Sequence, residues 1–142
     1  MALPDTLTFT TPTSRTTGIS SASLAAGARL LGSEIDNENT GDTLADIWIE
    51  WTCSSAPTAG QVIEVYLLYA RGTSYEDGDT SIDPKAPVIG VVPVYADTNT
   101  HRLCLRQRSL LPRKFKILLK SGLSVSATVT VYCDTYRVQV VD

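Results

Sequence analysis

Residues 45–53 show the most regular pattern in the chain, an alternation of apolar and polar side chains. Side chains of a β-strand point to opposite faces in turn, so this period of two predicts a strand with one face in a core. The expected core face carries Ala45, Ile47, Ile49, Trp51 and Cys53. The opposite face carries Asp46, Trp48, Glu50 and Thr52, which leaves Trp48 as a large aromatic side chain on the polar side.

Five further segments are also predicted as strands. They cover residues 61–70, 88–95, 101–108, 114–120 and 124–140. Segment 61–70 is apolar on both faces, which indicates a strand covered on both sides or near an interface. Pro93 cannot donate a backbone hydrogen bond, so its strand is expected at a sheet edge or beside a bulge. Segment 124–140 predicts one long strand or two strands joined by a bulge.

The N-terminal part and the connecting segments have less regular patterns. Residues 1–20 are rich in Thr and Ser, and they predict an extended arm, with a short strand at 6–10, that a neighbouring subunit could order. Residues 21–32 fit a short helix or a strand, and the strand is favoured because every clear element that follows is a strand. Residues 36–43 predict a turn cluster, and residues 71–87 an acidic loop long enough to be functional or mobile.

The spacing of these elements predicts the fold class. Short strands separated by turn residues, with no clear helix, are typical of an all-β sandwich or jelly roll of about seven or eight antiparallel strands. A chain of 142 residues suits one domain with its own core. We therefore expect an extended N-terminal arm over residues 1–20 and a single β-sandwich domain over residues 21–142.

Charge is distributed unevenly along the chain, although the net charge is only −3. Residues 34–83 contain eleven acids and one base, Arg71, whereas residues 102–120 contain seven bases and no acid. If the two groups lie on different faces, copies of the chain could dock head to tail or onto a charged shell. The alternative is that the two groups pair with each other across the sheets.

Few residues in the sequence are suited to catalysis. His101 is the only histidine, and it begins a basic strand with no nucleophile motif nearby, so we expect a surface residue. Cys53, Cys104 and Cys133 lie far apart in strand patterns, which predicts buried, inert thiols and no disulfide framework or zinc site. We expect no enzymatic activity and no cofactor or metal.

Three other classes of partner are disfavoured. Glu76, Asp77 and Asp79 lack the spacing and the closing glutamate of a calcium loop, so a solvated turn is expected. The basic stretch contains one aromatic residue, Phe115, on its apolar side, which argues against nucleic-acid binding. No apolar run approaches the roughly 20 residues of a membrane helix, and residues 1–6 do not resemble a secretory signal.

Some apolar residues fall on the wrong face of their strands. Trp48, Tyr66 and Leu68 lie opposite the expected core faces. If they share one sheet surface, they form an exposed aromatic patch, which marks a protein interface or a carbohydrate platform. The alternative is that the arm or the long loop covers them.

Five short motifs carry a resemblance to a known family. YLL at 66–68 is followed by YEDG at 75–78 and DP at 83–84, then by GVVPV at 90–94 and LPRKFK at 111–116. In these stretches the chain resembles a family of uncharacterised tailed-bacteriophage and prophage proteins, over about residues 23–137. The chain departs from the family at Arg71-Gly72, where an acidic residue and a glycine are usual.

The resemblance implies a virion structural protein, assembled in the host bacterial cytoplasm. We expect a capsid decoration or cement protein that stabilises the head, with the major capsid protein or other virion proteins as partners and a homo-oligomer, a trimer by preference, as its state. The alternatives are a tail, neck or fibre-base component, and a carbohydrate-binding module for host attachment that uses Trp48, Tyr66 and Tyr75. The candidate interface residues are Trp48, Tyr66, Leu68, Tyr75, Glu76, Asp77, Asp79, Arg102, Arg106, Arg108, Arg113, Lys114 and Lys116.

Overall fold

The computed structural model of the protein describes residues 6–9 and 15–141, with residues 6–9 and 139–141 described by their backbone alone. This part of the chain contains strands and no helix, as the alternating patterns predicted. The strands are β1 (Thr6–Phe9), β2 (Arg15–Leu24), β3 (Arg29–Leu31), β4 (Leu44–Cys53), β5 (Val62–Arg71), β6 (Ser74–Tyr75), β7 (Val88–Pro93), β8 (Thr100–Ser109), β9 (Phe115–Ser121), β10 (Ala127–Tyr136) and β11 (Val138–Val141).

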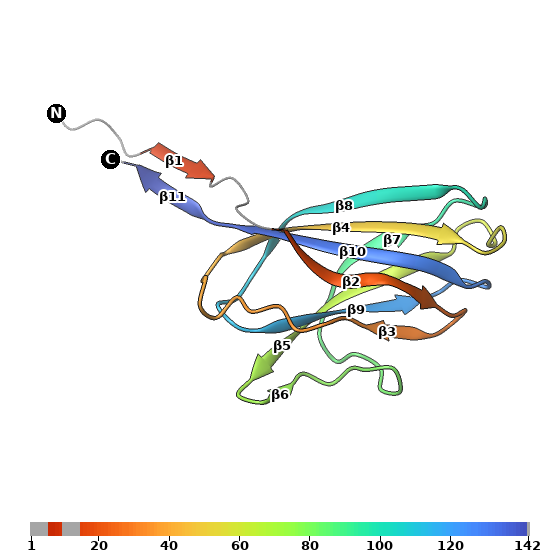
Figure 1. Ribbon diagram of the computed structural model, residues 1–142, viewed down its shortest axis with the longest axis horizontal. Coiled ribbons are helices and arrows are strands. Elements are labelled where there is room, and N and C mark those ends of the chain that lie inside the picture. Colours follow the sequence, from red (N-terminus) through yellow and green to blue (C-terminus); the bar gives the residue numbers. More distant parts are fainter. Residues whose placement is uncertain (1–5, 10–14, 142) are drawn as a thin grey trace.

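Two antiparallel sheets form the body of the protein (Figure 1). One sheet has the order β2-β10-β4-β8, and the other has β3, β9 and β5 in that order, with β7 and the short β6 both pairing with β5. Most consecutive strands therefore lie in opposite sheets, and only β5, β6 and β7 follow one another within one sheet. Two facing antiparallel sheets connected in this way form a jelly roll. The predicted β-sandwich is confirmed, and Pro93 ends the edge strand β7, as its missing N–H required.

The core lies between the sheets and follows the predicted alternation. The inward residues of β4 are buried, and its outward residues are half-buried. The other large contributors are Ile63, Val65, Leu67, Phe115, Ile117, Leu119, Val129, Val131 and Cys133, all nearly or completely buried. Burying one such side chain contributes about 1.5–3 kcal/mol, so this shared interior is the main source of stability.

A second apolar cluster lies on the sheet formed by β3, β9, β5, β6 and β7, on the face that points away from the core. It contains Tyr66, Leu68 and Leu118 from the sheet and Ala86 from the long loop. The expectation that Tyr66 and Leu68 share an exposed patch with Trp48 is therefore wrong, because Leu68 is 0% exposed and Tyr66 9%. Residues 76–87, here called the strap, cover them, as the second interpretation of the sequence proposed.

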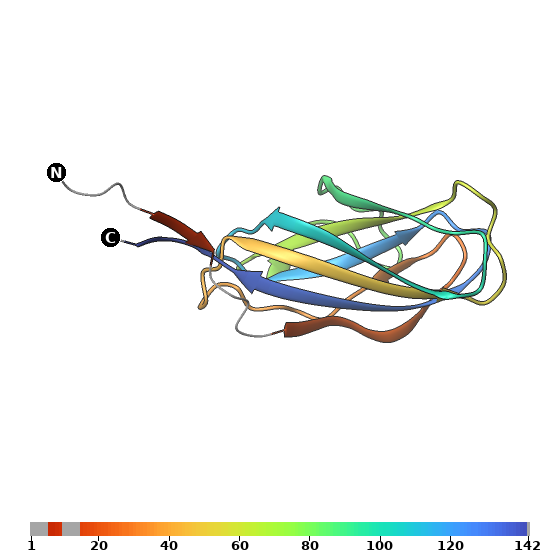
Figure 2. The same ribbon diagram turned by 90° about the horizontal axis from the view of Figure 1, so that it is seen from above.

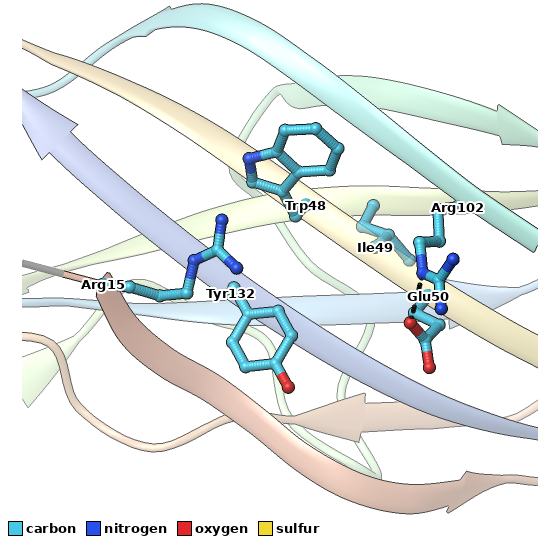
Figure 3. Close-up of a pocket in the computed structure, with 6 residues that line it drawn as sticks. All are labelled: Arg15, Trp48, Ile49, Glu50, Arg102 and Tyr132. Carbon is cyan, nitrogen blue, oxygen red and sulfur yellow. Dashed lines mark hydrogen bonds and ion pairs between the residues drawn. The ribbon is translucent and has the colours of Figure 1, made fainter. Parts of the chain in front are cut away.

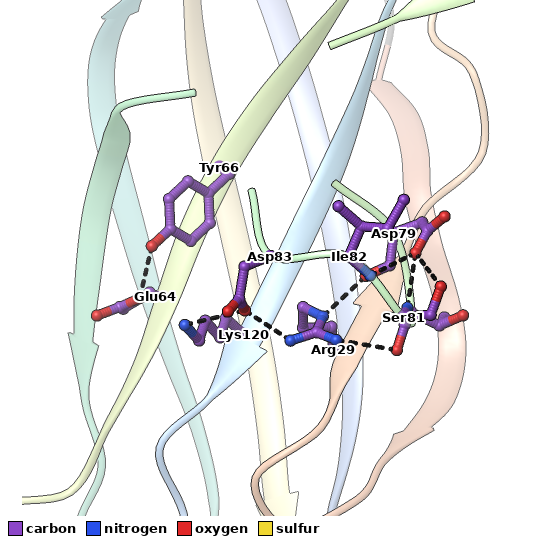
Figure 4. Close-up of polar contacts among 9 residues, drawn as sticks. Arg29, Glu64, Tyr66, Asp79, Ser81, Ile82, Asp83 and Lys120 are labelled. Atoms are coloured by element: carbon purple, nitrogen blue, oxygen red, sulfur yellow. Dashed lines mark hydrogen bonds and ion pairs between the residues drawn. The ribbon is translucent and has the colours of Figure 1, made fainter. Parts of the chain in front are cut away.

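Polar contacts hold the strap against the sheet (Figure 4). Asp83 accepts a hydrogen bond from Arg29 at 2.6 Å and lies 3.2 Å from the Lys120 ammonium group. Arg29 also donates to the backbone carbonyl of Asp79 at 2.9 Å, and the Asp79 side chain caps the turn through the Ser81 and Ile82 amides. The strap is thus tied to β3 and β9 by the Asp83 carboxylate and to β3 by the Asp79 carbonyl. The Asp79 side chain, by contrast, stabilises its own turn and, among the described residues, accepts no hydrogen bond from another element.

The N-terminal part differs from the predicted arm. Residues 15–20 belong to β2, which pairs with β10 along its length, so the sandwich begins at Arg15 and not at residue 21. Residues 21–32 contain the end of β2, a turn and β3, in place of one strand or helix. Gly32 allows a close approach there, because a Cβ atom on it would lie 2.5 Å from the Gly18 carbonyl oxygen.

A two-stranded ribbon extends from the body (Figures 1 and 2). Its strands are β1, the predicted short strand, and β11, which follows β10 after one residue. Segment 124–140 therefore forms two strands, as one of its alternatives stated. Residues 1–5 and 10–14 of the predicted arm lie outside the described residues.

Some of the acids and bases pair between the two charged parts of the sequence. Arg102 contacts Glu50 at 2.6 Å, Lys114 contacts Glu34 at 3.8 Å, and Lys120 contacts Asp83 at 3.2 Å. The interpretation that the two groups neutralise each other is confirmed for these three bases.

Candidate functional site

A hollow of about 270 Å³ opens on the outer face of the sheet β2-β10-β4-β8 (Figure 3). Outer face here means the surface of that sheet that points away from the core. The hollow is lined by Arg15, Trp48, Ile49, Glu50, Arg102 and Tyr132. These residues come from all four strands of the sheet, so only the complete sheet brings them together.

The strand register places two aromatic residues opposite each other on the outer face. Trp48 on β4 and Tyr132 on β10 are direct cross-strand partners, and both point outward because their neighbours along the strands point into the core. Cross-strand partners on one face have Cβ atoms about 4.5–5.5 Å apart. Figure 3 shows that their rings extend away from each other across the outer face, with the Arg15 guanidinium near both, so the sheet presents two separate aromatic groups around the hollow.

Arg15, the first residue of β2, forms one wall of the hollow. Its guanidinium lies 5.0 Å from the Tyr132 ring centroid and 5.9 Å from that of Trp48. Nε and Nη2 donate to the two carboxylate oxygens of Asp134 at 2.9 and 3.0 Å. These hydrogen bonds raise the pKa of Arg15, so the side chain stays cationic. The paired carboxylate and the two rings fix its position.

The opposite wall is an ion pair between neighbouring strands. Arg102 on β8 is the cross-strand partner of Glu50 on β4, and its Nε donates to Glu50 Oε2 at 2.6 Å. The Arg102 side chain is 68% exposed. Among the described residues, its two terminal nitrogens have no hydrogen-bond acceptor.

The lining residues are suited to non-covalent binding. They include one carboxylate, two guanidinium groups and two aromatic rings, but no histidine, serine or cysteine. Hydrolysis of a glycosidic bond commonly uses two carboxyl groups that flank it, and Glu50 is the one carboxylate among the lining residues. Ring faces that can stack, with hydrogen-bonding groups around them, are typical of ligand recognition.

The predicted interface residues do not form one surface in the structure but lie in several separate regions. Trp48 and Arg102 line the hollow, and Arg106 and Arg108 lie further along β8. Tyr75 lies in β6, at the edge of the sheet that contains β5 and β9. Its hydroxyl donates a hydrogen bond to Glu34, and its ring centroid lies 4.4 Å from the Lys116 ammonium group. The remaining members lie around that sheet or in the strap, namely Tyr66, Leu68, Glu76, Asp77, Asp79, Arg113 and Lys114.

Sequence reasoning missed Arg15, Glu50 and Tyr132 as site residues. For Tyr132 a signal was present, because Val131 and Cys133 point into the core and the residue between them must point outward. Arg15 had no such signal, since its segment was expected in the arm. Its role depends on the pairing of β2 with β10.

His101 and the cysteines lie outside the hollow. His101 is half-buried, with Nε2 2.7 Å from Asp97 and its ring near those of Trp51 and Tyr95, so the expected surface histidine is in fact packed. The cysteines are free, with Cys53 and Cys133 buried as predicted and Cys104 half-buried. Burial raises the pKa of Cys133 to about 12. No cluster of possible metal ligands occurs among the described residues.

Comparisons with known proteins add little to this geometry. No family model matches the chain. No curated protein matches it either. A solved structure described as "CBM4 structure and function" is similar over 84% of this chain and 81% of its own, with 11% sequence identity and a TM-score of 0.34. The described part of the chain has no helix long and apolar enough to cross a membrane.

Proposed function

We propose that this chain is a non-enzymatic binding domain that holds a carbohydrate in the hollow on the outer face of the sheet β2-β10-β4-β8. The observation that carries the proposal is the presence of two outward aromatic side chains, Trp48 and Tyr132, at one hollow, with charged hydrogen-bonding side chains on both sides. The apolar C–H faces of a sugar ring stack on aromatic rings, while its hydroxyl groups need hydrogen-bond partners at the rim.

The hollow is preformed in the free protein. Trp48 and Tyr132 stand on the two central strands of the sheet, and Arg15 is held by Asp134 through two hydrogen bonds. A site on rigid strands loses little conformational freedom when a ligand binds, which favours affinity. A volume of about 270 Å³ is small among ligand sites, so it suits one sugar unit of a longer chain.

Binding of the full chain to a glycan array, followed by calorimetry on each hit, tests this proposal. Trp48→Ala is expected to reduce affinity at least about tenfold, because stacking aromatic groups commonly dominate such sites. Trp48→Phe should retain part of the affinity. Tyr75→Ala, which removes an aromatic ring at the other sheet, serves as the matched control and should bind normally. Glycan binding that survives Trp48→Ala would contradict the proposal.

A second function is favoured by the terminal ribbon. The chain would be a virion structural protein, most simply a capsid decoration protein, that joins its neighbours through β1 and β11. In the described residues these strands pair with each other alone, so both outer edges of the ribbon are open, and Val138 is 39% exposed. An isolated two-stranded ribbon is marginally stable, and an added strand from a neighbouring copy would stabilise it.

Truncation tests the second function. Removing residues 1–14 deletes β1 but keeps Arg15 and the whole of β2, so the sandwich should fold with nearly unchanged circular dichroism. Light scattering should then show loss of self-association, and labelled particles should show loss of occupancy. A chain that lacks only residues 1–5 is the control. Unchanged oligomer mass and particle occupancy after removal of β1 would refute the role of the ribbon, and copy number per particle separates a decoration protein from a tail component.

A further inference from the structure

We infer that the sugar bound in the hollow is acidic, with its carboxylate held by the terminal nitrogens of Arg102. The inference rests on the proposed carbohydrate-binding function and specifies its ligand class. It follows from the charges around the hollow, from which of their hydrogen-bonding groups are already used, and from the position of Arg102 relative to the aromatic rings.

The charged side chains of the hollow differ in how many of their hydrogen-bonding atoms already have a partner in the protein. Arg15 is engaged by both oxygens of Asp134, and Glu50 accepts from Arg102 Nε. The two terminal nitrogens of Arg102 form an edge with no acceptor among the described residues. A guanidinium edge of this kind binds a planar carboxylate with two parallel hydrogen bonds. Arg102 can therefore donate to a second carboxylate in addition to Glu50.

The position of Arg102 suits a carboxylate attached to a stacked sugar ring. Glu50 lies two residues beyond Trp48 on β4, which places it about 7 Å further along the outer face. Arg102 is the cross-strand partner of Glu50, one strand spacing to the side. A sugar ring stacked on Trp48 can thus place a carboxylate that projects from it against Arg102.

The charge of the sheet edge supports the same ligand. Strand β8 contains Arg102, Arg106 and Arg108 and no acid, whereas the chain as a whole has a net charge of −3. The acids on the same face are Glu50, which pairs with Arg102, Asp134, which pairs with Arg15, and Asp46, which accepts from the Gln107 amide. The two guanidinium groups of the hollow are balanced by the paired carboxylates of Glu50 and Asp134, and Arg106 and Arg108 against Asp46 leave a small excess of positive charge along β8 that attracts an anion.

The test compares acidic and neutral sugars that are otherwise alike. Calorimetry of the full chain would use oligomers of galacturonic acid and of galactose with the same length and linkage, and a second pair made from glucuronic acid and glucose. We expect the acidic member of a pair to bind about tenfold tighter at low salt, with the preference shrinking as salt screens the charges.

Two variants at the ion pair should act in opposite directions. Arg102→Gln should reduce affinity for the acidic sugar much more than affinity for the neutral one, so that the preference within a pair disappears. Glu50→Gln should raise affinity for the acidic sugar a few-fold, because it removes the anion that competes for Arg102. A purely structural role of the pair would make both variants weaken binding. Arg106→Gln, on the same strand, is the matched control and should keep most of the preference.

The outcomes separate this inference from the function it rests on. Equal affinity for acidic and neutral sugars, or an equal loss for both in Arg102→Gln, overturns the acidic ligand and leaves carbohydrate binding in place. Binding of neither acidic nor neutral sugars in the calorimetric series and on the array overturns both proposals.

Discussion

The guanidinium of Arg15 clasps the carboxylate of Asp134 with two hydrogen bonds of 2.9 and 3.0 Å, and so joins the first residue of β2 to its register partner on β10. Asp134 is 9% exposed, and the rings of Trp48 and Tyr132 lie beside the guanidinium. The contact between Arg15 and Asp134 therefore holds the edge strand β2 against β10 and also fixes one wall of the hollow.

Arg15→Lys is expected to lower the melting temperature and to weaken sugar binding, because an ammonium group keeps the charge but not the paired, planar geometry. Asp134→Asn should lower the melting temperature as well. The double variant should be no less stable than the worse single variant, since both remove one interaction. Thermal unfolding of the four proteins measures this coupling, and purely additive effects would show that the contact contributes nothing.

Leu68→Ala is expected to reduce the free energy of unfolding by about 2–5 kcal/mol, because it leaves a cavity beneath the strap. Leu68 is 0% exposed and lies against Gly78, where a Cβ atom would be 3.1 Å from Leu68 Cδ1. Leu111→Ala is the matched control, since Leu111 is 49% exposed, and it should change stability by no more than about 0.5 kcal/mol. Urea denaturation compares them, and equal effects would contradict the described packing of the strap.

The strap is expected to open in acid because of Asp83. The hydrogen bond and charge of Lys120, with a smaller contribution from Arg29, lower the pKa of Asp83 in the folded protein. A carboxyl group with a lowered pKa stabilises the folded form above its unfolded pKa, about 3.9, and the contribution is lost as the pH falls through the folded value. Hydrogen exchange at the Lys85 amide, which donates to Asp77, should therefore speed up below about pH 4.

Asp83→Asn provides the control for that experiment. The variant should exchange faster at neutral pH, because an amide cannot form the ion pairs with Arg29 and Lys120. Its exchange should also change less between pH 5 and pH 3 than that of the natural chain, once the intrinsic pH dependence of exchange is subtracted. An identical pH profile in the two proteins would exclude Asp83 as the acid-sensitive group.

Cys133 is expected to be unreactive in the folded protein. Burial raises the pKa of its thiol to about 12, so at pH 8 only about one thiol in ten thousand is a thiolate. Titration with a disulfide reagent at pH 8 should modify the half-buried Cys104 first and Cys133 only at the rate of unfolding. Mass spectrometry identifies the modified residue, and early labelling of Cys133 would show that the core opens locally.

Much of the fold could be predicted because strand patterns are local. The alternation over residues 45–53 predicted β4 within one residue, including Trp48 on the outer side. The effect of Pro93 also needed no tertiary information, since its missing N–H restricts it to an edge wherever the strand pairs. The end of the arm was predicted less well, because residues 15–20 contain few apolar side chains and form a strand through their pairing with β10.

The sequence alone thus determined an all-β chain with alternating faces and a few outward aromatic side chains, because these properties depend on neighbours one or two residues away. It could not determine which of those aromatic side chains share a surface. Trp48 joined Tyr132, 84 positions later, because β4 pairs with β10, whereas Tyr66 was buried because the strap folds over the other sheet. Strand order and loop packing depend on contacts between distant residues, and only the tertiary structure decides them.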